Sequence, residues 1–366
     1  MGFKCGIVGL PNVGKSTLFN ALTQTAAAQA ANYPFCTIEP NTGLVGVPDD
    51  RLDVLAKIAG SQKIIPTQLT FVDIAGLVRG ASKGEGLGNQ FLAHIREVDA
   101  ICHVLRCFED GDITHVEGRV DPVADAETVE TELMLSDLES LERRVEQTAK
   151  RAKQGNEEEK QRLAVMEKVL AALRDGKPAR TVVPTDDEKK FYKELMLITA
   201  KPVLYVCNVE EASAADGNAF SERVKAKAAA EGAAMVVISA AIEAEVAQLD
   251  SDEEKAAFLA DLGLKETGLA RVIRAGYGLL DLLTFFTVGP KEARAWTVRK
   301  NAKAPEAAGA IHTDFEKGFI RAETIAYNDY VAGKGEAGAR DAGKLRLEGK
   351  DYIVQDGDVM HFRFNT

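Results

Sequence analysis

The sequence predicts an α/β protein built on a doubly wound, mainly parallel sheet, and three observations lead to this prediction. Helix-like stretches separate most of the strand-like apolar runs, an alternation typical of parallel sheets. A glycine-rich loop follows the first run, at the strand end where such sheets bind ligands. With 366 residues, 46% of them hydrophobic, the chain can form the cores of two or three domains. The strand-like runs are 4–8, 43–47, 69–74, 100–105, 203–207 and 234–238.

The glycine-rich loop has the sequence Gly9-Leu-Pro-Asn-Val-Gly-Lys-Ser-Thr17 and precedes a helix-like stretch. This is the phosphate-loop pattern G-x-x-x-x-G-K-[ST] in its strand–loop–helix setting. Gly9 and Gly14 let backbone N–H groups point at phosphate oxygens, and the helix adds its partial positive charge. We expect Lys15 to reach the β- and γ-phosphates and the Ser16 hydroxyl to bind Mg²⁺. The expected nucleotide contacts here are Asn12, Val13, Gly14, Lys15, Ser16 and Thr17. The alternative is a glycine-rich turn with a surface lysine.

A second motif, Asp73-Ile-Ala-Gly76, ends the apolar run 69–74. Asp73 can hold Mg²⁺ through water, and the Gly76 N–H can reach a γ-phosphate. Between the two motifs lies a loop at 32–41 with two prolines and no periodicity. Thr37 in this loop can close over the γ-phosphate and Mg²⁺ as an order–disorder switch. The alternative is a surface loop with an ordinary threonine.

Together these motifs resemble a translation-factor-class GTPase, a P-loop NTPase. The run from Asp73 to Leu92 resembles the Obg superfamily, and the whole chain resembles its YchF/Ola1 subfamily, the Obg-like ATPases. The resemblance covers essentially all 366 residues. It implies a nucleotide hydrolase that acts as a ribosome-associated switch in the cytoplasm, with Lys15, Thr37 and Gly76 in catalysis and Mg²⁺ held by Ser16, Thr37 and Asp73.

Leu77 occupies the place where many GTPases carry the glutamine that orients the attacking water. An aliphatic side chain cannot orient water, so we expect slow intrinsic hydrolysis or a replacement group. Three replacements stay open. Asn12 can help hold an activating K⁺, His115 can contact the water, or a partner can supply the group. The glycine-rich segment 80–88 is the expected second switch.

The apolar run 203–207 ends in Asn208-Val209-Glu210-Glu211, at the place where GTPases carry N-K-x-D. Glu211 is one methylene longer than the aspartate that reads guanine, which moves the carboxylate by about 1.5 Å. Hydrogen-bond geometry does not tolerate that displacement. Adenine instead offers an N6 amine, which can donate a hydrogen bond to Asn208 or to backbone carbonyls. We therefore expect ATP to be preferred over GTP, with Val209, Glu211, Ser239 and Ala240 also in the base pocket.

The pattern changes at Asp125, where apolar residues recur at helical spacing up to Lys153. A break at 154–156 is followed by a second apolar stripe over 163–173. We interpret this as an antiparallel, coiled-coil-like helical hairpin inserted in the nucleotide domain. We expect this hairpin to be a structural arm. The alternative is a docking role for its tip or its charged faces.

Residues 244–280 are helix-like, and the segment after them consists of short strand-like runs and turns. This C-terminal segment resembles the TGS domain, a β-grasp, with residues 311–322 carrying the likeness. The expected domains are therefore 1–124 with 200–280 for nucleotide binding, 125–199 for the arm, and 281–366 for the β-grasp. Basic residues surround Trp296, and Arg294, Arg299 and Lys300 are candidates for RNA or partner contacts. The alternative is a solvated strand pair with Trp296 in a core.

Charge and composition limit the classes of partner. The formal net charge is −11, whereas residues 281–366 hold 13 Lys and Arg against 13 Asp and Glu. A broad electrostatic grip on nucleic acid is therefore not expected, and any contact with rRNA or tRNA should be local. Five cysteines without a C-x-x-C pair fit buried thiols in a reducing cytosol. No 18-residue apolar span indicates a membrane segment.

Three functional hypotheses follow. The first is a Mg²⁺-dependent ATPase that works as a slow ribosome-binding switch. The second is a GTPase with a divergent base motif, in which backbone contacts hold guanine. The third is a non-catalytic scaffold that senses nucleotide, for which Leu77 is the best support.

Overall fold

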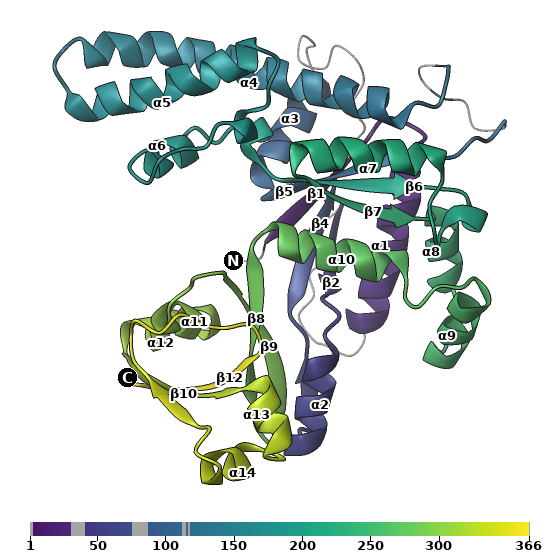
Figure 1. The fold of residues 1–366 in the computed structure, drawn as a ribbon, viewed down its shortest axis with the longest axis vertical. Coiled ribbons are helices and arrows are strands. Elements are labelled where there is room, and N and C mark those ends of the chain that lie inside the picture. Colours follow the sequence, from purple (N-terminus) through teal and green to yellow (C-terminus); the bar gives the residue numbers. More distant parts are fainter. Residues whose placement is uncertain (1–2, 31–40, 75–86, 112–114, 116–117, 366) are drawn as a thin grey trace. The chain divides into compact units, whose positions relative to one another are not determined.

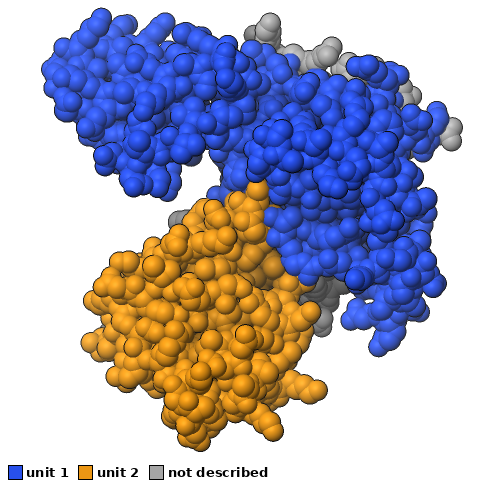
Figure 2. All heavy atoms as spheres, in the orientation of Figure 1, with its two compact units in different colours: residues 1, 3–43, 70–275 blue, residues 2, 44–69, 276–366 orange. Residues whose placement is uncertain are grey.

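The structure is a computed structural model in which the chain forms two compact units, coloured separately in Figure 2. The described residues are 3–30, 41–74, 87–111, 115 and 118–365. Thr37, Gly76, Leu77 and residues 80–86 of the expected second switch lie outside them, whereas residues 87 and 88 begin a helix. Unit 1 comprises residues 3–43 and 70–275, and unit 2 comprises 44–69 and 276–366.

The sheet that carries the phosphate loop has six strands in the order β2-β4-β1-β5-β6-β7. β1 pairs in parallel with β4 and β5, β5 with β6, and β6 with β7. Every residue of β5 and β6 is buried, as expected for central strands of a sheet covered by helices. All six predicted strands are confirmed, as are the parallel pairing and the alternation with helices. They are β1 (Lys4–Val8), β2 (Thr42–Gly46), β4 (Gln68–Asp73), β5 (Ala100–Arg106), β6 (Val203–Asn208) and β7 (Ala234–Ile238).

Local capping interactions define where several helices of unit 1 begin. Asn218 and Ser251 each form a capping box with the third residue of the helix that follows. The buried carboxylate of Glu243 accepts from the backbone N–H groups of Gly268 and Leu269 and so holds the start of α10. None of the described helices is both long and apolar enough to cross a bilayer. The helices are α1 (Lys15–Ala30), α3 (Leu87–Glu97), α7 (Ala219–Glu231), α8 (Ala240–Val246), α9 (Asp252–Asp261) and α10 (Gly268–Leu279).

The predicted helical hairpin is confirmed as α4 (Pro122–Ala152) and α5 (Glu157–Arg174), which lie side by side in Figure 1. Asn156 caps α5 by accepting from the N–H groups of Glu158 and Glu159. The hairpin has its own apolar core, to which the following segment with α6 (Lys189–Glu194) contributes Phe191. Buried core residues include Leu141, Val165, Met166, Val169, Leu170 and Leu173.

Two sets of polar contacts fasten α4 to the segments that follow α5, and the first of them is buried. Asp137 of α4 accepts from the backbone N–H groups of Ile198 and Thr199, at 3.0 and 2.7 Å, and from the Thr199 hydroxyl. Burial raises the pKa of Asp137 despite these hydrogen bonds. Arg180 pairs with Glu130 of α4. In the second half of α4, Arg144 donates to the carbonyl oxygens of Leu195 and Glu194, so the segment with α6 is held to this half of the helix as well.

The sheet of unit 2 has the order β11-β10-β12-β8-β9-β3. Its central pair, β12 with β8, is parallel, whereas β8–β9, β10–β12 and β10–β11 are antiparallel. This order with a parallel central pair is that of a β-grasp, so the prediction is confirmed. Of the short strand-like runs in this segment, residues 352–354 form only an isolated bridge, between Ile353 and Lys303. The strands are β3 (Lys63–Ile65), β8 (Leu282–Val288), β9 (Glu292–Arg299), β10 (Phe319–Ala326), β11 (Arg346–Glu348) and β12 (Asp358–Phe364).

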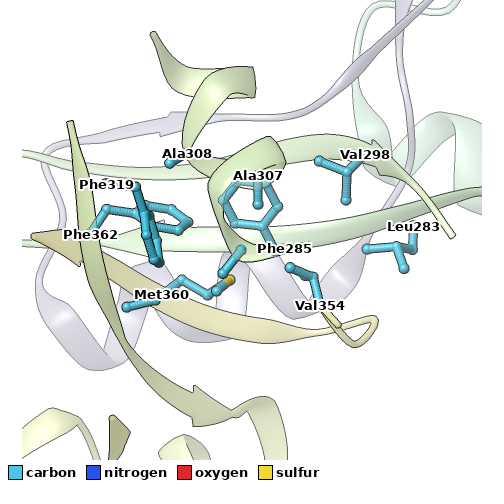
Figure 3. Close-up of a cluster of buried hydrophobic side chains, with 11 residues drawn as sticks. Leu283, Phe285, Val298, Ala307, Ala308, Phe319, Val354, Met360 and Phe362 are labelled. Atoms are coloured by element: carbon cyan, nitrogen blue, oxygen red, sulfur yellow. The ribbon is translucent and has the colours of Figure 1, made fainter. Parts of the chain in front are cut away.

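One core of unit 2 lies between this sheet and α11 (Ala304–Ile311), as Figure 3 shows. Phe285 is fully buried and meets Phe362 edge-on, with ring centroids 5.9 Å apart. The fully buried residues that the helix contributes to this core are alanines, Ala304, Ala307 and Ala308, and Ile311 at its end is partly buried against them. Small side chains let the helix backbone approach the aromatic rings closely. Short helices α12 (Thr313–Lys317), α13 (Tyr327–Ala332) and α14 (Glu336–Asp341) complete the unit.

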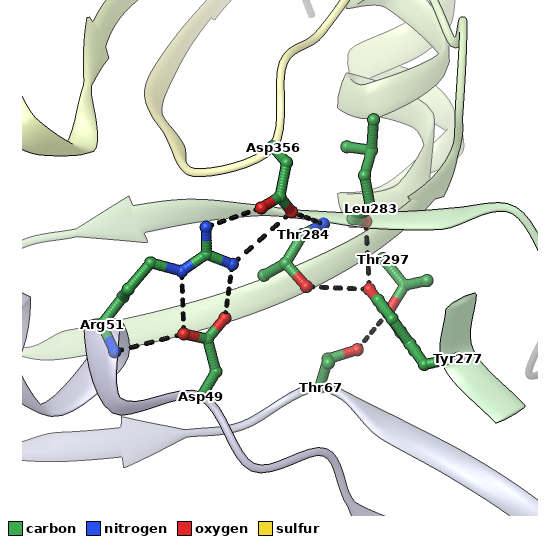
Figure 4. Close-up of polar contacts among 8 residues, drawn as sticks. All are labelled: Asp49, Arg51, Thr67, Tyr277, Leu283, Thr284, Thr297 and Asp356. Atoms are coloured by element: carbon green, nitrogen blue, oxygen red, sulfur yellow. Dashed lines mark hydrogen bonds and ion pairs between the residues drawn. The ribbon is translucent and has the colours of Figure 1, made fainter. Parts of the chain in front are cut away.

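Residues 44–69 belong to unit 2 although the expected domain limits placed them with the nucleotide domain. β3 pairs with β9, and α2 (Asp50–Ala59) packs its apolar side against the second core of the unit. Figure 4 shows the polar contacts that fix this segment. Arg51 bridges Asp49 and Asp356, and the hydroxyl of Thr67 bonds to that of Thr297. No local pattern indicates this arrangement, because Arg51 and Asp356, Thr67 and Thr297, and the strands β3 and β9 each lie more than 200 residues apart in the chain.

Candidate nucleotide-binding site

The phosphate loop connects the end of β1 to the start of α1, as predicted. Its backbone is left-handed at Asn12 and Gly14, with φ angles of 63° and 90°. A Cβ on Gly14 would lie 2.2 Å from Nδ2 of Asn208, and one on Gly9 would lie 2.7 Å from the carbonyl oxygen of Val104. Both glycines are therefore required by close approach, and Gly14 also by its φ.

Lys15 and Asp73 meet across this loop, with Nζ and Oδ1 3.0 Å apart. The pairing of β1 with β4 explains the contact, since Ile7 lies opposite Asp73 in the sheet. Both side chains are mostly buried, so each compensates the charge of the other. Arriving phosphate oxygens would compete for the lysine and leave the carboxylate available to a cation. The predicted pair of phosphate and metal ligands is thus brought together, and Ser16 lies exposed one residue away on α1.

Asn208 links three segments of the site. Its Nδ2 donates to the carbonyl oxygen of Val13 at 3.0 Å, and its Oδ1 accepts from the backbone N–H of Ala240 at 2.9 Å. The side chain is buried, with 4% of the residue exposed. The prediction offered Asn208 as one acceptor for a base amine, but the structure uses both ends of its amide to hold the phosphate loop against the start of α8. Asn208 is thereby a positioning residue.

A cavity of about 600 Å³ opens beside these groups. Its volume suits a mononucleotide-sized ligand. The Oγ of Ser239 at its wall is buried and has no hydrogen-bond partner among the described residues. An unsatisfied buried hydroxyl at a cavity wall is a candidate ligand contact. The lining residues are Asn12, Gly14, Thr17, Phe108, Glu109, Asp110, Asn208, Val209, Glu210, Glu211, Ser239, Ala240 and Ala241.

The loop after β5 forms one wall of this cavity, and the sequence reasoning missed it. Arg106 ends β5 and is only 1% exposed. Its guanidinium donates to the carbonyl oxygens of Phe108 and Asp110 and lies 4.7 Å from the Phe108 ring centroid. A buried arginine so fixes both the loop and the ring that faces the cavity. The available signal was an arginine at the end of a mainly apolar strand, with an aromatic residue two positions later.

The three residues after Asn208 differ in their surroundings. Val209 is 3% exposed, and its N–H donates to the carbonyl oxygen of Ile238. Glu210 accepts from Asn218 and Ser213. Burial opposes the ionisation of Glu210, but these hydrogen bonds outweigh it and lower the pKa of this carboxyl.

Glu211 is exposed at the cavity wall, where it begins the short 3₁₀ helix Glu211–Ser213. Of the two carboxylates, only Glu211 is therefore in a position to meet a base edge.

His115 does not join the residues that line the cavity. Its Nε2 lies 2.9 Å from Oδ2 of Asp125, and both side chains are 4% exposed. Asp125 belongs to the first turn of α4, so the histidine is packed against the base of the arm. The structure thus gives His115 a buried carboxylate partner at the start of α4 and not a place at the cavity wall.

The basic residues near Trp296 in the sequence have different surroundings in the structure. The guanidinium of Arg294 lies 3.9 Å from the Trp296 ring centroid. Arg299 instead donates to the carbonyl oxygen of Leu280, and Lys300 lies 3.5 Å from Asp281. Because a strand rises about 3.3 Å per residue, these two side chains start roughly 17–20 Å along β9 from Arg294. The predicted cluster is therefore not a single surface.

Comparisons with known proteins agree with this fold. A family model described as "50S ribosome-binding GTPase" matches residues 4–168. The model YchF-GTPase_C, described as "Protein of unknown function (DUF933)", matches residues 282–365. A solved structure titled as the Schizosaccharomyces pombe YchF GTPase is 40% identical, with a TM-score of 0.89 over 99% of this chain and 98% of that one. A GTP binding protein from Pyrococcus horikoshii, 20% identical with a TM-score of 0.62, shares the fold.

Curated relatives match over their whole length. The protein from Haemophilus influenzae is 62% identical, and the one from Bacillus subtilis is 56% identical, each with 100% of both chains covered. Both carry the name Ribosome-binding ATPase YchF. At this identity and coverage, and with the phosphate loop, the hairpin and the β-grasp in place, the chain belongs to the YchF family.

Proposed function

We propose that this protein is a Mg²⁺-dependent nucleotide hydrolase that prefers ATP over GTP and acts as a slow switch on the ribosome. Membership of the family supports hydrolysis, and the name Ribosome-binding ATPase YchF of its relatives supports the ribosome as partner. The solved Schizosaccharomyces pombe relative is titled a GTPase, so the base is the point to be decided. A partnership with ribosomes supports the cytoplasm as the proposed location of this chain.

The arrangement of residues 208–211 is the observation that carries the ATP preference. Asn208 is held by Val13 and Ala240, and Glu210 by Ser213 and Asn218. Glu211 is then the only carboxylate of the motif left for a guanine edge, and it is one methylene too long. Adenine, by contrast, needs only an acceptor for its N6 amine, which a backbone carbonyl of the cavity wall supplies.

The phosphate end of the site suits Mg²⁺. Hard oxygen donors are present in the Ser16 hydroxyl and the Asp73 carboxylate, and Mg²⁺ in nucleotide sites needs only one or two protein ligands beside phosphates and water. No group of three or more His, Cys, Asp or Glu side chains that could hold a metal occurs among the described residues. In our proposal Thr37 adds a further oxygen, Gly76 contacts the γ-phosphate, and K⁺ beside Asn12 activates hydrolysis.

Slow turnover follows from Leu77, which cannot orient water. The contact of His115 with Asp125 would have to break before its imidazole could reach a nucleotide. A group brought by the ribosome, or K⁺, is therefore the simpler source of acceleration. ATP and the Mg²⁺ ion would order the Thr37 loop, and hydrolysis would release it.

The first experiment is calorimetric titration of the purified protein with ATP and with GTP, both with Mg²⁺. We expect at least a tenfold preference for ATP, about 1.4 kcal/mol. The double variant Val209→Lys, Glu211→Asp should move the preference toward GTP. Equal or GTP-favoured binding by the wild type, unchanged in the double variant, would establish the GTPase alternative instead.

Hydrolysis and partner binding need separate assays. Phosphate release should be slow, should rise with K⁺ or ribosomes, and should disappear in Lys15→Ala, since Lys15 carries the phosphate contact. Turnover equal to buffer under all these conditions would leave the nucleotide-sensing scaffold as the function. Co-sedimentation with ribosomes, with and without ATP, tests the partner directly.

A further inference from the structure

A long groove crosses one face of unit 2. Two cavities of about 970 and 680 Å³ lie side by side there, since they share five lining residues. The shared residues are Glu292, Trp296, Ile311, Phe315 and Phe364. Together the cavities exceed the size of a site for one small molecule. The groove, which we call the Trp296 groove, is therefore suited to a length of chain.

The walls of the Trp296 groove are flat and preorganised. Trp296 donates from Nε1 to the Thr287 hydroxyl at 2.8 Å, which fixes the indole plane. The guanidinium of Arg294 is stacked on this ring. Phe315 and Phe364 form a second stacked pair, with ring centroids 3.8 Å apart and planes at 24°. All three aromatic residues are only partly buried.

The charges around the groove are few and mixed. Arg294 and Lys317 form no ion pair with any described residue, whereas Arg363 is held by Glu323. Glu292 and Asp314 bring negative charge to the same rim. A strong grip on a phosphate backbone is therefore excluded, and planar stacking is what the surface offers. Unpaired bases stack on aromatic rings and on arginine planes, and flexible single strands present them in succession.

We propose that the Trp296 groove binds two or three successive unpaired bases of a single-stranded RNA segment. This rests on the proposed function, because it specifies how a ribosome-bound protein would contact RNA. Trp296 with Arg294 forms one platform, Phe315 with Phe364 forms the next, and Lys317 contacts the intervening phosphate. Double-stranded RNA is excluded, since its bases are stacked on one another and do not reach the ring faces.

The chain supplies its own reporter, because Trp296 is its one tryptophan. Titration of the full chain, without nucleotide, with a short single-stranded oligoribonucleotide should quench the tryptophan fluorescence to a plateau. The same sequence annealed to its complement should not quench it. Phe315→Leu keeps the reporter, removes one platform and should weaken the affinity at least tenfold. Lys317→Gln should lower the salt dependence of binding by roughly one phosphate contact.

Leu347→Ala is the matched control, because Leu347 is 60% exposed on β11 of the same unit and lies outside the groove. It should bind RNA like the wild type. Thermal midpoints equal to that of the wild type for both Phe315→Leu and Leu347→Ala would exclude unfolding as the cause of weaker binding. If duplex and single strand quench equally, if Phe315→Leu binds normally, or if only an unstructured peptide quenches, the inference is wrong.

This test is independent of the nucleotide site. Lys15→Ala should bind the oligoribonucleotide like the wild type, and Phe315→Leu should hydrolyse ATP normally in the absence of ribosomes. A wild-type protein that hydrolyses ATP but does not bind the oligoribonucleotide would overturn the inference alone. A wild-type protein that binds the oligoribonucleotide but does not hydrolyse ATP would overturn only the proposed function.

Discussion

Replacing Asn208 with alanine tests how the phosphate loop is held. The substitution removes the donor to Val13 and the acceptor of Ala240, and both backbone groups face a buried position. A buried group left without its partner costs about 1–3 kcal/mol. Two such groups give a loss of roughly 2–4 kcal/mol once water has entered part of the space. At about 2–4 °C per kcal/mol, unit 1 should melt roughly 5–15 °C lower.

The loss of nucleotide affinity should exceed what any direct base contact would give. Asn208 fills the space against Gly14, where a Cβ would lie 2.2 Å from its Nδ2. Without it the loop has to be ordered by the nucleotide itself, and we expect ATP and GTP to bind at least tenfold more weakly. Both nucleotides should be affected alike, because the contact concerns the phosphate loop and not the base.

The assay combines scanning calorimetry with titration of ATP and GTP below the melting transition. Asn156→Ala is the matched control, since it removes the cap of α5 at about 1 kcal/mol and lies in the arm. It should leave nucleotide affinity unchanged. If Asn208→Ala binds both nucleotides within twofold of the wild type, the loop does not depend on this link. A loss confined to ATP would instead make Asn208 a base contact.

Three further predictions concern single side chains. Gly14→Ala places a Cβ against Asn208 at a φ of +90°, so ATP binding should fall below detection in calorimetric titration while the secondary structure is retained. Phe285→Ala removes a fully buried ring, and urea unfolding followed by Trp296 fluorescence should show unit 2 destabilised by about 3–5 kcal/mol. Burial, with the positive charges of Lys227 and Arg180, lowers the pKa of His103 to about 3. The unfolded chain therefore takes up a proton below pH 6.5 that the fold does not, and stability should fall by about 1.4 kcal/mol per pH unit down to pH 3. His103→Phe should abolish that part of the slope in denaturant titrations, and an unchanged slope would refute it.

Strands and helices with long, regular patterns were predictable. The six apolar runs of the first sheet and the two stripes of the hairpin specify their elements locally, and the structure confirms them. β3 was not predictable, because three residues carry no period and their partner β9 lies more than 220 residues further on. Long-range pairing of this kind leaves no local signal.

The candidate site shows the same division. The loop Gly9–Thr17 and Asp73 followed from spacing alone, and Lys15 meets Asp73 as their strands require. The partners of Asn208 and the packing of Arg106 against Phe108 depend on the paths of two loops, which no motif describes. Lys300 was grouped with Arg294 because the two are close in sequence. An extended strand places residues six positions apart at a distance of about 20 Å, and Lys300 lies beside Asp281 instead.

The membership of residues 44–69 in unit 2 has a consequence for how this chain is made. β3 leaves the ribosome long before β9, its partner in the sheet, and before β12, which completes the centre of that sheet. At about 5–20 residues per second, the delay between β3 and β9 is roughly 10–45 s. During this time the apolar side of α2, with Leu52 and Leu55, has none of its final neighbours from residues 276–366. The early segment thus completes its packing only near the end of translation, and the nascent chain exposes this apolar side over a predictable range of lengths.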